Sequence, residues 1–422
     1  MIETGQTEHT RKERRRWVIF ALCSLLFISS QFYRVSNAII APQLQADFSI
    51  TSEQLGLLSA AFFYAFAFAQ IPLALLLDRL GARIIMAALS MVGAMGAWAF
   101  AGAQGLGVGV VGRMLLGLGM AGNLMGSLKL FTEWFPPRQF ATLSGVLLAT
   151  GTIGNMVAAT PLALLMDAIG WRYSFVIIGC TTAFLSALFF FVVRDRQAQI
   201  ALSHGKKTEV YSLSKMIGLL LSLREYWLIS LGTFFRYGVF VAIQGLWAGP
   251  YLMNGLGFSP VEAGNILLML NIGLVVGSPL GGWLSDRILN SRKMAVILGL
   301  SVMSLSLFCL SMGFFRDKAL ILGIVFFFFG LSSGFGIIMY AHIKEWVPAG
   351  MQGMALTGVN LFTMLGAALF MQGMGWVLDQ WKAGTLAGPG DYQKAFFIGL
   401  IGMVIALGLY FLTREREAEE TL

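Results

Sequence analysis

Long apolar segments recur along this sequence, and they restrict the possible folds more than any other feature. A helix needs about 20 apolar residues to cross a bilayer, and the 422-residue chain contains twelve such segments. Because lipid offers the backbone no hydrogen bonds, each segment is expected to be a helix. Only 12% of the residues are charged, against about 25% in soluble domains. The sequence therefore predicts an all-α membrane protein with twelve transmembrane helices, near residues 18–42, 54–77, 84–104, 108–131, 139–165, 173–193, 226–250, 262–285, 294–315, 319–342, 352–375 and 395–413.

Basic residues are distributed unevenly between the segments that connect these helices. With the N-terminus inside the cell, 21 of the 29 Lys and Arg residues fall in cytoplasmic segments and 5 in outer loops. This bias is the positive-inside pattern of membrane proteins, so we expect both termini to be cytoplasmic. The net charge of +8 then reflects topology rather than binding to nucleic acid. The expected organisation is a cytoplasmic N-terminal tail (1–17), a six-helix bundle (18–193), a cytoplasmic linker (194–225), a second six-helix bundle (226–413) and a cytoplasmic tail (414–422).

The two expected bundles carry related sequences. The first contains the segment LLLDRLGAR (75–83), and the second contains GWLSDRILNSRK (282–293). Three acidic residues recur at separations of 208, 212 and 212 residues, in the pairs Asp78 and Asp286, Glu133 and Glu345, and Asp167 and Asp379. Repeated halves are typical of secondary transporters, whose substrate site lies between the repeats near the membrane midplane. The sequence therefore predicts two pseudo-symmetric six-helix bundles.

The sequence contains no motif for nucleotide hydrolysis or metal-dependent catalysis. No segment has the pattern of a phosphate-binding P-loop, a zinc-binding His-Glu-x-x-His helix or a nucleophile elbow. We therefore expect neither an ATP-driven pump nor an enzyme, and neither a cofactor nor a metal ion.

Three short motifs resemble those of a known family. The sequence DRLGAR occupies residues 78–83, its echo DR begins at residue 286, and GRMLLGLG spans residues 112–119. These motifs resemble the major facilitator superfamily over nearly the whole chain, and they imply the major facilitator fold. The resemblance implies that the cytoplasmic helix ends are held together in one state of the transport cycle by Asp78, Arg79, Arg83, Asp286 and Arg287. Asp78 would sit at the entrance of the following helix, where the helix dipole favours a carboxylate. The alternative is that the arginines only anchor the loops at the cytoplasmic surface.

Three arginines, Arg34, Arg113 and Arg236, lie inside the predicted spans. A charged side chain in a span costs about 2.5–3.5 kcal/mol on insertion scales, and all 21 acidic residues fall in loops, tails or span ends. Unpaired buried cations are unfavourable, whereas an anionic substrate would neutralise them, because guanidinium groups bind carboxylates and phosphates in bidentate fashion. The alternatives are that Arg34 and Arg113 extend to the membrane surface, or that Arg113 has a structural role.

Other polar residues share helix faces with two of these arginines. Gln244 and Trp247 follow Arg236 at helical spacing, and Gln31 lies one turn before Arg34. We therefore predict a substrate site that consists of Arg34, Arg113, Arg236, Gln244, Trp247, Gln31, Tyr33 and Asn360. For Trp247 the alternative is the aromatic belt of the outer interface, and for Asn360 it is a hydrogen bond between helices.

A closer resemblance concerns three longer segments. The chain is similar to the organic anion transporters of the superfamily in FYRVSNAIIAPQL (32–44), LLSAAFFYAFAFAQIPLALLLDR (57–79) and KLFTEWFPPRQFATLSG (129–145). Those proteins carry sugar acids, phosphate or glutamate and have arginines in helices 1, 4 and 7, so the resemblance implies an anionic substrate. Proton-coupled members tend to carry acidic residues where this chain has Tyr33 and Met120, so proton coupling by that route is not implied.

The expected function is secondary transport of a small organic anion, bearing a carboxylate or phosphate, by alternating access of the two bundles. The other functions considered are export of amphipathic drugs or metabolites, transport of amino acids or short peptides, and a non-transporting receptor. The short tails and linker do not favour the receptor. We expect a monomer in the bacterial inner membrane, whose partners are the anionic substrate and the lipid bilayer.

Overall fold

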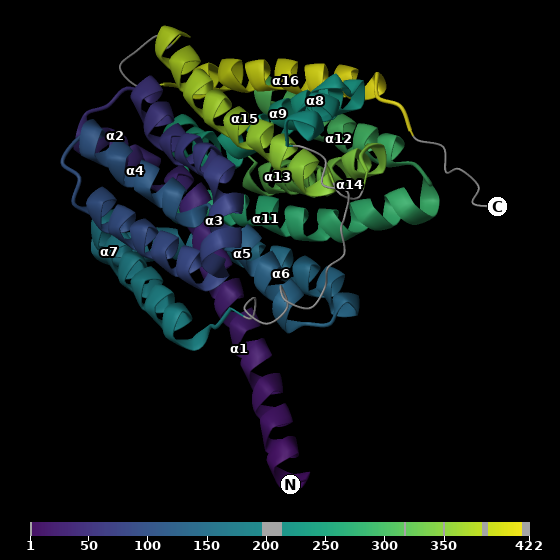
Figure 1. The fold of residues 1–422 in the computed structure, drawn as a ribbon. Coiled ribbons are helices and arrows are strands. Elements are labelled where there is room, and N and C mark those ends of the chain that lie inside the picture. Colours follow the sequence, from purple (N-terminus) through teal and green to yellow (C-terminus); the bar gives the residue numbers. More distant parts are fainter. Residues whose placement is uncertain (1, 196–212, 316–317, 349–350, 382–386, 416–422) are drawn as a thin grey trace.

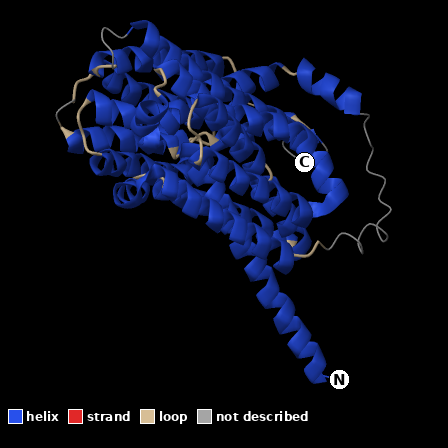
Figure 2. Ribbon diagram, turned by 90° about the vertical axis from the view of Figure 1, so that its left-hand side faces the viewer, coloured by secondary structure: helices blue, strands red, loops and turns tan. Residues whose placement is uncertain are grey.

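Helices form nearly all of the described structure. The computed structural model describes residues 2–195, 213–315, 318–348, 351–381 and 387–415, and none of these residues lies in a β-strand (Figure 1, Figure 2). The predicted all-α fold is therefore confirmed. The α-helices are α1 (Ile2–Val35), α2 (Asn37–Phe48), α3 (Ser52–Ala101), α4 (Leu106–Met120), α5 (Asn123–Trp134), α6 (Pro137–Val157), α7 (Thr160–Val192), α8 (Leu213–Ser222), α9 (Arg224–Ala242), α10 (Ala248–Pro250), α11 (Pro260–Trp283), α12 (Arg292–Met312), α13 (Ala319–Gly334), α14 (Ile337–Trp346), α15 (Gln352–Trp381) and α16 (Pro389–Phe411). Three short π-helical segments are η2 (Ile243–Trp247), η3 (Tyr251–Gly255) and η4 (Leu284–Ile288).

The helices correspond closely to the predicted membrane spans. In the described part of the chain, 11 helices are long and apolar enough to cross a membrane. The predicted span without a counterpart among them, 54–77, lies in the first part of α3. That part is helical over residues 52–80, and four of its side chains, at positions 71, 74, 75 and 78, are outside the described set. All twelve predicted spans are therefore helical.

Two of the long helices contain parts of two predicted spans, joined at a single glycine. α3 changes direction at Gly81 (φ 83°, ψ 159°), and α7 does so at Gly170 (φ 78°, ψ 161°). Positive φ is costly for a residue with a Cβ atom. At Gly81 a Cβ would in addition clash with the carboxylate of Asp195. Glycine therefore allows one span to end and the next to begin without an intervening loop.

Four spans are interrupted within the membrane region. The α-helical hydrogen-bond pattern is interrupted at Ser36 between α1 and α2, at residues 121–122 between α4 and α5, at η2 after α9, and at residues 335–336 between α13 and α14. An interruption leaves backbone carbonyl groups without their usual partners, and neighbouring side chains satisfy some of them. Gln70 Nε2, for example, donates to Ala121 O (3.4 Å).

The two bundles contact each other along two groups of helices. α15 packs against α3 as well as α9, and α11 packs against α6 and α7. Asp379 of α15 accepts hydrogen bonds from the backbone N–H groups of Ser52 (3.1 Å) and Glu53 (2.7 Å) at the start of α3. Thr160 Oγ1 donates to Asn265 Oδ1 (2.8 Å). These contacts join the bundles at the helix ends that the sequence predicts to face outward.

The predicted tails and linker are only partly described. α1 begins at Ile2, so the expected tail 1–17 is helical from residue 2 onward, and the start of α1 projects from the body of the molecule (Figure 1). Residues 196–212 of the expected linker and residues 416–422 of the expected C-terminal tail lie outside the described residues. The cytoplasmic assignment of these segments stays a prediction.

Candidate functional site

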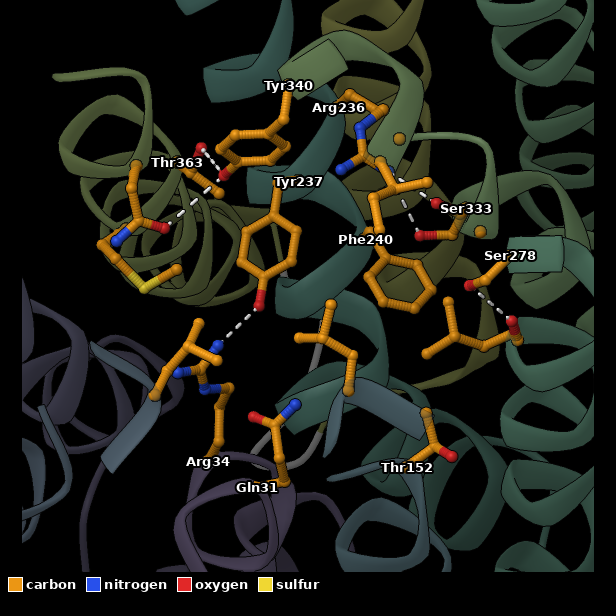
Figure 3. A pocket seen from close by; sticks show the side chains of 18 of the residues that line it. Gln31, Arg34, Thr152, Arg236, Tyr237, Phe240, Ser278, Ser333, Tyr340 and Thr363 are labelled. Atoms are coloured by element: carbon orange, nitrogen blue, oxygen red, sulfur yellow. Dashed lines mark hydrogen bonds between the residues drawn. The ribbon is translucent and has the colours of Figure 1, made fainter. Parts of the chain in front are cut away.

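A cavity of about 510 Å³ lies between the two bundles. Sites for small organic ligands typically have volumes of about 300–1,000 Å³. α1, α5 and α6 of the first bundle line the cavity, together with α9, η2, α11, α13, α14 and α15 of the second (Figure 3). The polar lining residues are Gln31, Arg34, Thr152, Asn155, Arg236, Tyr237, Gln244, Ser278, Ser333, Tyr340, Lys344, Asn360 and Thr363.

Arg34 extends from the last turn of α1 into this cavity. Its Nη1 donates a hydrogen bond of 2.9 Å to the hydroxyl of Tyr237 on α9, which joins the two bundles across the cavity (Figure 3). Its Cζ lies 4.9 Å from the ring centre of Phe66 and 5.9 Å from that of Phe63, where aromatic faces attract cations. A guanidinium carries five N–H donors, and Nε has no partner among the described residues. Arg34 therefore retains hydrogen-bonding capacity for a ligand.

Arg236 lies one residue before Tyr237, and its side chain is only 5% exposed. Its Nη1 donates to the carbonyl oxygen of Ser333 (2.8 Å) and lies 3.4 Å from Ser333 Oγ. A Cβ on Gly336 would clash with the guanidinium. Ser333 precedes the interruption between α13 and α14 and Gly336 lies within it, so this region supplies both the carbonyl and the space that hold Arg236.

Other polar side chains of the cavity are held by hydrogen bonds between helices. The hydroxyl of Tyr340 lies 3.1 Å from Thr363 Oγ1 and donates to Asn360 Oδ1 (3.5 Å). Gln244 Nε2 donates to Asn271 Oδ1 (2.8 Å). By contrast, the side-chain oxygens Gln31 Oε1 and Asn155 Oδ1 have no partner among the described residues. These two oxygens are available to a ligand that carries hydrogen-bond donors.

The cavity is positively charged. Arg34, Arg236 and Lys344 line it, and no lining residue in the described part of the chain is an Asp or a Glu. Charges interact more strongly in a partly desolvated cavity than in water. The arrangement is therefore suited to a small molecule with an anionic group and a polar remainder.

The structure brings only part of the predicted substrate site together. Arg113 is fully buried in α4, and its Nη1 donates to the backbone carbonyl of Tyr33 (2.8 Å). Tyr33 is fully buried as well. Trp247, 1% exposed, donates from Nε1 to Met371 O (2.9 Å). The cavity thus contains the predicted residues Arg34, Arg236, Gln31, Gln244 and Asn360, whereas Arg113, Tyr33 and Trp247 lie outside it.

Several lining residues were not predicted from the sequence. Tyr237 directly follows Arg236, and its hydroxyl in an apolar span was a signal that could have found it. Ser333 and Thr363 give no clear signal in the sequence, because Ser and Thr hydroxyls in helices commonly donate to a carbonyl of their own helix. Thr363 does so to Val359 O (2.8 Å). Lys344 follows the end of the predicted span 319–342, where the charge pattern predicts a cytoplasmic surface residue rather than a site residue.

The predicted gating residues of the first bundle lie around Gly81. The side chain of Asp78 is outside the described residues, and Arg79 is exposed. Arg83 contacts the end of α7, since its Nε donates to Phe190 O (2.8 Å). Its backbone N–H donates to Asp195 Oδ1 (3.0 Å). Asp195, which we did not predict, therefore lies at the start of a helix, where the helix dipole favours a carboxylate.

The predicted gating residues of the second bundle are exposed, and one of them is paired. Asp286 forms an ion pair with Arg292, and Arg292 Nε lies 3.2 Å from Glu345 Oε1. Arg287 is exposed. Each of these contacts stays within the second bundle, so the gating role of these loops stays a prediction.

The fold and the cavity together define the class of protein. Two bundles of membrane helices, an internal repeat and interrupted helices beside a central polar cavity are features of secondary transporters. The chain is therefore a membrane transporter.

The comparison with known families gives the same class. The model of the Major Facilitator Superfamily matches residues 22–248 and 229–422. Because the match extends over nearly the whole chain, this protein belongs to the Major Facilitator Superfamily.

Individual relatives have low sequence identity to this chain, but the matches cover most of its length. The probable sulfoacetate transporter of Cupriavidus necator is 24% identical over 419 residues, which cover 94% of this chain and 93% of the relative. The hexuronate transporter of Escherichia coli (strain K12) is 27% identical over 319 residues, which cover 68% of this chain and 71% of the relative. The fold matches that of a bacterial homolog to the human lysosomal transporter Spinster, in an inward-facing and unoccupied conformation, with a TM-score of 0.80, 18% identity and coverage of 94% of this chain and 96% of that chain.

Proposed function

We propose that this protein moves a small organic anion, bearing a carboxylate or phosphate group, across the membrane by alternating access. One observation carries the proposal: guanidinium groups from both bundles, Arg34 and Arg236, line one cavity that has no carboxylate among its described residues. An anionic group between them would accept charge-assisted hydrogen bonds, which are about twice as strong as neutral ones. Two relatives are named for the transport of sulfoacetate and hexuronate, both of which are organic anions.

The remainder of the ligand would contact the amides of the cavity. Gln31 Oε1 and Asn155 Oδ1 lack partners, and a buried acceptor without a hydrogen bond is unfavourable. A hydroxyl group on the ligand would satisfy such an oxygen. Gln244 and Asn360, which are held by neighbouring helices, would contact the ligand from the second bundle. These contacts favour a small anion that also carries hydroxyl groups.

The arrangement of the bundles supports an inward-facing state. At the ends predicted to face outward, Asp379 bonds to the start of α3 and Thr160 bonds to Asn265. The cavity instead reaches Lys344, an exposed residue near the end of α14 that is predicted to be cytoplasmic. An anion that contacts both Arg34 and Arg236 would draw the bundles together around the cavity and promote closure of the inner side.

The proposal includes the position of the protein in the cell. A monomer in the bacterial inner membrane with both termini in the cytoplasm agrees with the distribution of basic residues and with relatives from bacteria. Green fluorescent protein fused to the C-terminus should fluoresce, since it folds in the cytoplasm. A dark fusion with an active periplasmic reporter at the same place would contradict this orientation.

The central test is ligand binding by the purified protein. Thermal unfolding is measured with sulfoacetate, D-glucuronate, neutral D-glucose and the cation choline, because a ligand stabilises the folded state by RT ln(1 + [L]/Kd). We expect one of the anions to raise the unfolding temperature, and Arg34→Ala and Arg236→Ala each to reduce that shift strongly at a fixed anion concentration. Arg138→Ala is the matched control, since it removes an exposed arginine that does not line the cavity, and it should leave the shift unchanged.

Uptake into proteoliposomes then tests transport itself. The anion that stabilises the protein should accumulate in vesicles that contain the wild-type chain and not in those with Arg34→Ala. Stabilisation by glucose or choline that persists in both arginine variants would overturn the proposal and favour transport of neutral or cationic compounds.

A further inference from the structure

Arg113 is a buried cation outside the cavity. It lies in α4, its exposed fraction is 0%, and its Cζ is 5.1 Å from the ring centre of Phe62 and 5.9 Å from that of Phe100. Its Nη1 makes one hydrogen bond, of 2.8 Å, to the carbonyl oxygen of Tyr33. Its Nε and Nη2 have no partner among the described residues. The side chain thus directs its charge at a single point of the α1 backbone.

That point is the residue immediately before Arg34. Tyr33 is held in three ways: its carbonyl accepts from Arg113, the same carbonyl lies 3.4 Å from Ser36 Oγ, and its hydroxyl lies 3.0 Å from Thr182 Oγ1. Two residues after Tyr33, α1 ends at Val35. A carbonyl at the end of a helix has fewer partners within the helix, so Arg113 bonds the backbone where α1 is least held by its own hydrogen bonds.

The geometry of a helix links Tyr33 to Arg34. Successive residues point about 100° apart around a helix axis with 3.6 residues per turn. With Tyr33 facing Thr182 and Arg113 inside the first bundle, Arg34 is turned toward the cavity and Tyr237. A rotation of this last turn would move the Arg34 guanidinium away from the anion. Binding groups act only when neighbouring residues hold them in place.

We propose that Arg113 is a positioning residue, which supports anion binding by holding the turn of α1 that carries Arg34. The inference rests on the proposed role of Arg34 as an anion ligand. Arg113 itself does not contact the substrate, because it does not line the cavity.

The second bundle contains a related contact. Arg236 on α9 donates from Nη1 to the carbonyl of Ser333, also at 2.8 Å, and Ser333 precedes the interruption between α13 and α14. In both bundles, therefore, a buried arginine bonds a backbone carbonyl next to a helix interruption. The two differ in exposure to the ligand, since Arg236 lines the cavity and Arg113 does not.

A double-mutant cycle tests the inference. The dissociation constant of the stabilising anion, sulfoacetate or D-glucuronate, is measured for Arg113→Met, Arg34→Ala and the double variant. If Arg113 acts through Arg34, Arg113→Met raises Kd about tenfold, a typical effect of losing a hydrogen bond to a charged group, and changes Kd no further in the Arg34→Ala background. An equal loss in both backgrounds would overturn the inference.

Two variants separate positioning from a general effect on folding. Arg113→Lys keeps a cationic donor for the Tyr33 carbonyl and should restore most of the affinity. If Arg113→Met does not fold, Arg113→Gln, which removes the charge and keeps a polar side chain, replaces it in the cycle. Ser186→Ala removes another buried bond from a side chain to a backbone carbonyl in the same bundle, Ser186 Oγ to Ala87 O (2.7 Å). We expect Ser186→Ala to lower the unfolding temperature without changing Kd.

A second measurement does not depend on the substrate. Cys23, Cys180 and Cys309 are replaced by serine, Arg34→Cys is introduced, and the rate of its reaction with uncharged N-ethylmaleimide is measured. We expect Arg113→Met to slow the reaction, because residue 34 then turns away from the cavity, and Ser186→Ala to leave the rate unchanged. An unchanged rate in Arg113→Met would overturn the inference, even if the proposed role of Arg34 holds. If instead Arg34→Ala binds anions normally, the proposed function fails, and the labelling rate still decides whether Arg113 positions residue 34.

Discussion

Arg34 of the first bundle and Tyr237 of the second bundle are joined across the central cavity by a hydrogen bond of 2.9 Å (Figure 3). The tyrosine hydroxyl accepts a hydrogen bond from one N–H group of the Arg34 guanidinium. This guanidinium is one of the two groups that we propose bind the anion. An incoming carboxylate that takes this N–H must displace the hydroxyl. Tyr237 is thus a competitor of the anion and, at the same time, a direct link between the bundles inside the cavity.

Tyr237→Phe is therefore expected to tighten anion binding. A hydrogen bond to a side chain contributes about 1 kcal/mol net, so Kd should fall by less than about tenfold. The measurement is a titration of the unfolding temperature with sulfoacetate or D-glucuronate. Tyr64→Phe is the control, because its hydroxyl also joins the two bundles, through Gln372 Oε1 (3.0 Å), but does not line the cavity. A large rise in Kd for Tyr237→Phe would show instead that the hydroxyl binds the anion.

Gly336→Ala is expected to weaken anion binding with little loss of stability. The backbone of Gly336 (φ −61°, ψ −20°) is compatible with alanine, but the new Cβ would clash with the end of the flexible Arg236 side chain. The guanidinium must then leave the Ser333 carbonyl. We expect Kd to rise by about tenfold, the scale of one charge-assisted hydrogen bond.

Gly353→Ala provides the matched control for this prediction. A Cβ on Gly353, in α15 of the same bundle, meets no atom within 4 Å, so neither Kd nor the unfolding temperature should change. If Gly336→Ala bound the anion as tightly as Gly353→Ala does, the position of the Arg236 guanidinium would not matter for binding.

The membrane helices could be predicted from the sequence because their signal is local. Apolar length and the distribution of Lys and Arg along the chain determine spans and topology, and the repeat of Asp78 and Asp286 marked the two halves. The site was harder to predict, because it depends on how each helix is rotated. Arg34 and Arg113 both lie in apolar segments, yet only Arg34 lines the cavity.

The remaining differences between the predicted site and the site in the structure arise from contacts between residues that are distant in the sequence. Arg113 packs against Phe62 and Phe100 of α3, and no feature of α4 alone specifies these neighbours. Asp195 reaches the backbone N–H of Arg83 across 112 positions of sequence. Such pairings depend on the packing of whole helices, so they cannot be predicted from single sequence segments.

Arg292→Gln tests the ion pairs near the predicted inner gate. Arg292 pairs with Asp286 and Glu345, but all three side chains are 31–55% exposed. Pairs of this kind contribute about 0–1 kcal/mol and weaken with added salt. We expect a small decrease in unfolding temperature at low salt that disappears at about 1 M NaCl.

The control for this prediction is Arg287→Gln. Arg287 is exposed, and the substitution Arg287→Gln removes the same charge from the same part of the chain. It should leave the unfolding temperature unchanged at both salt concentrations. A salt-independent loss of stability in Arg292→Gln would mean that packing of the side-chain stem, rather than ion pairing, holds this part of the bundle together.

Asp379→Asn is expected to loosen the contact between the bundles at the helix ends that are predicted to face outward. Both carboxylate oxygens of Asp379 accept backbone hydrogen bonds at the start of α3, from Ser52 and Glu53, and a negative charge at a helix N-terminus contributes about 0.3–1 kcal/mol.

Loss of about 1 kcal/mol changes an equilibrium between inward-facing and outward-facing states about fivefold. Spin labels at the exposed residues Tyr173 and Leu320, near the ends of the two bundles that are predicted to face outward, should then show a larger population of long distances. Asp167→Asn is the matched control, because Asp167 is the repeat partner of Asp379 but is exposed, and it should leave the distances unchanged. Equal distance distributions for Asp379→Asn and the wild type would mean that the apolar contacts between the bundles are sufficient to keep the outer side closed.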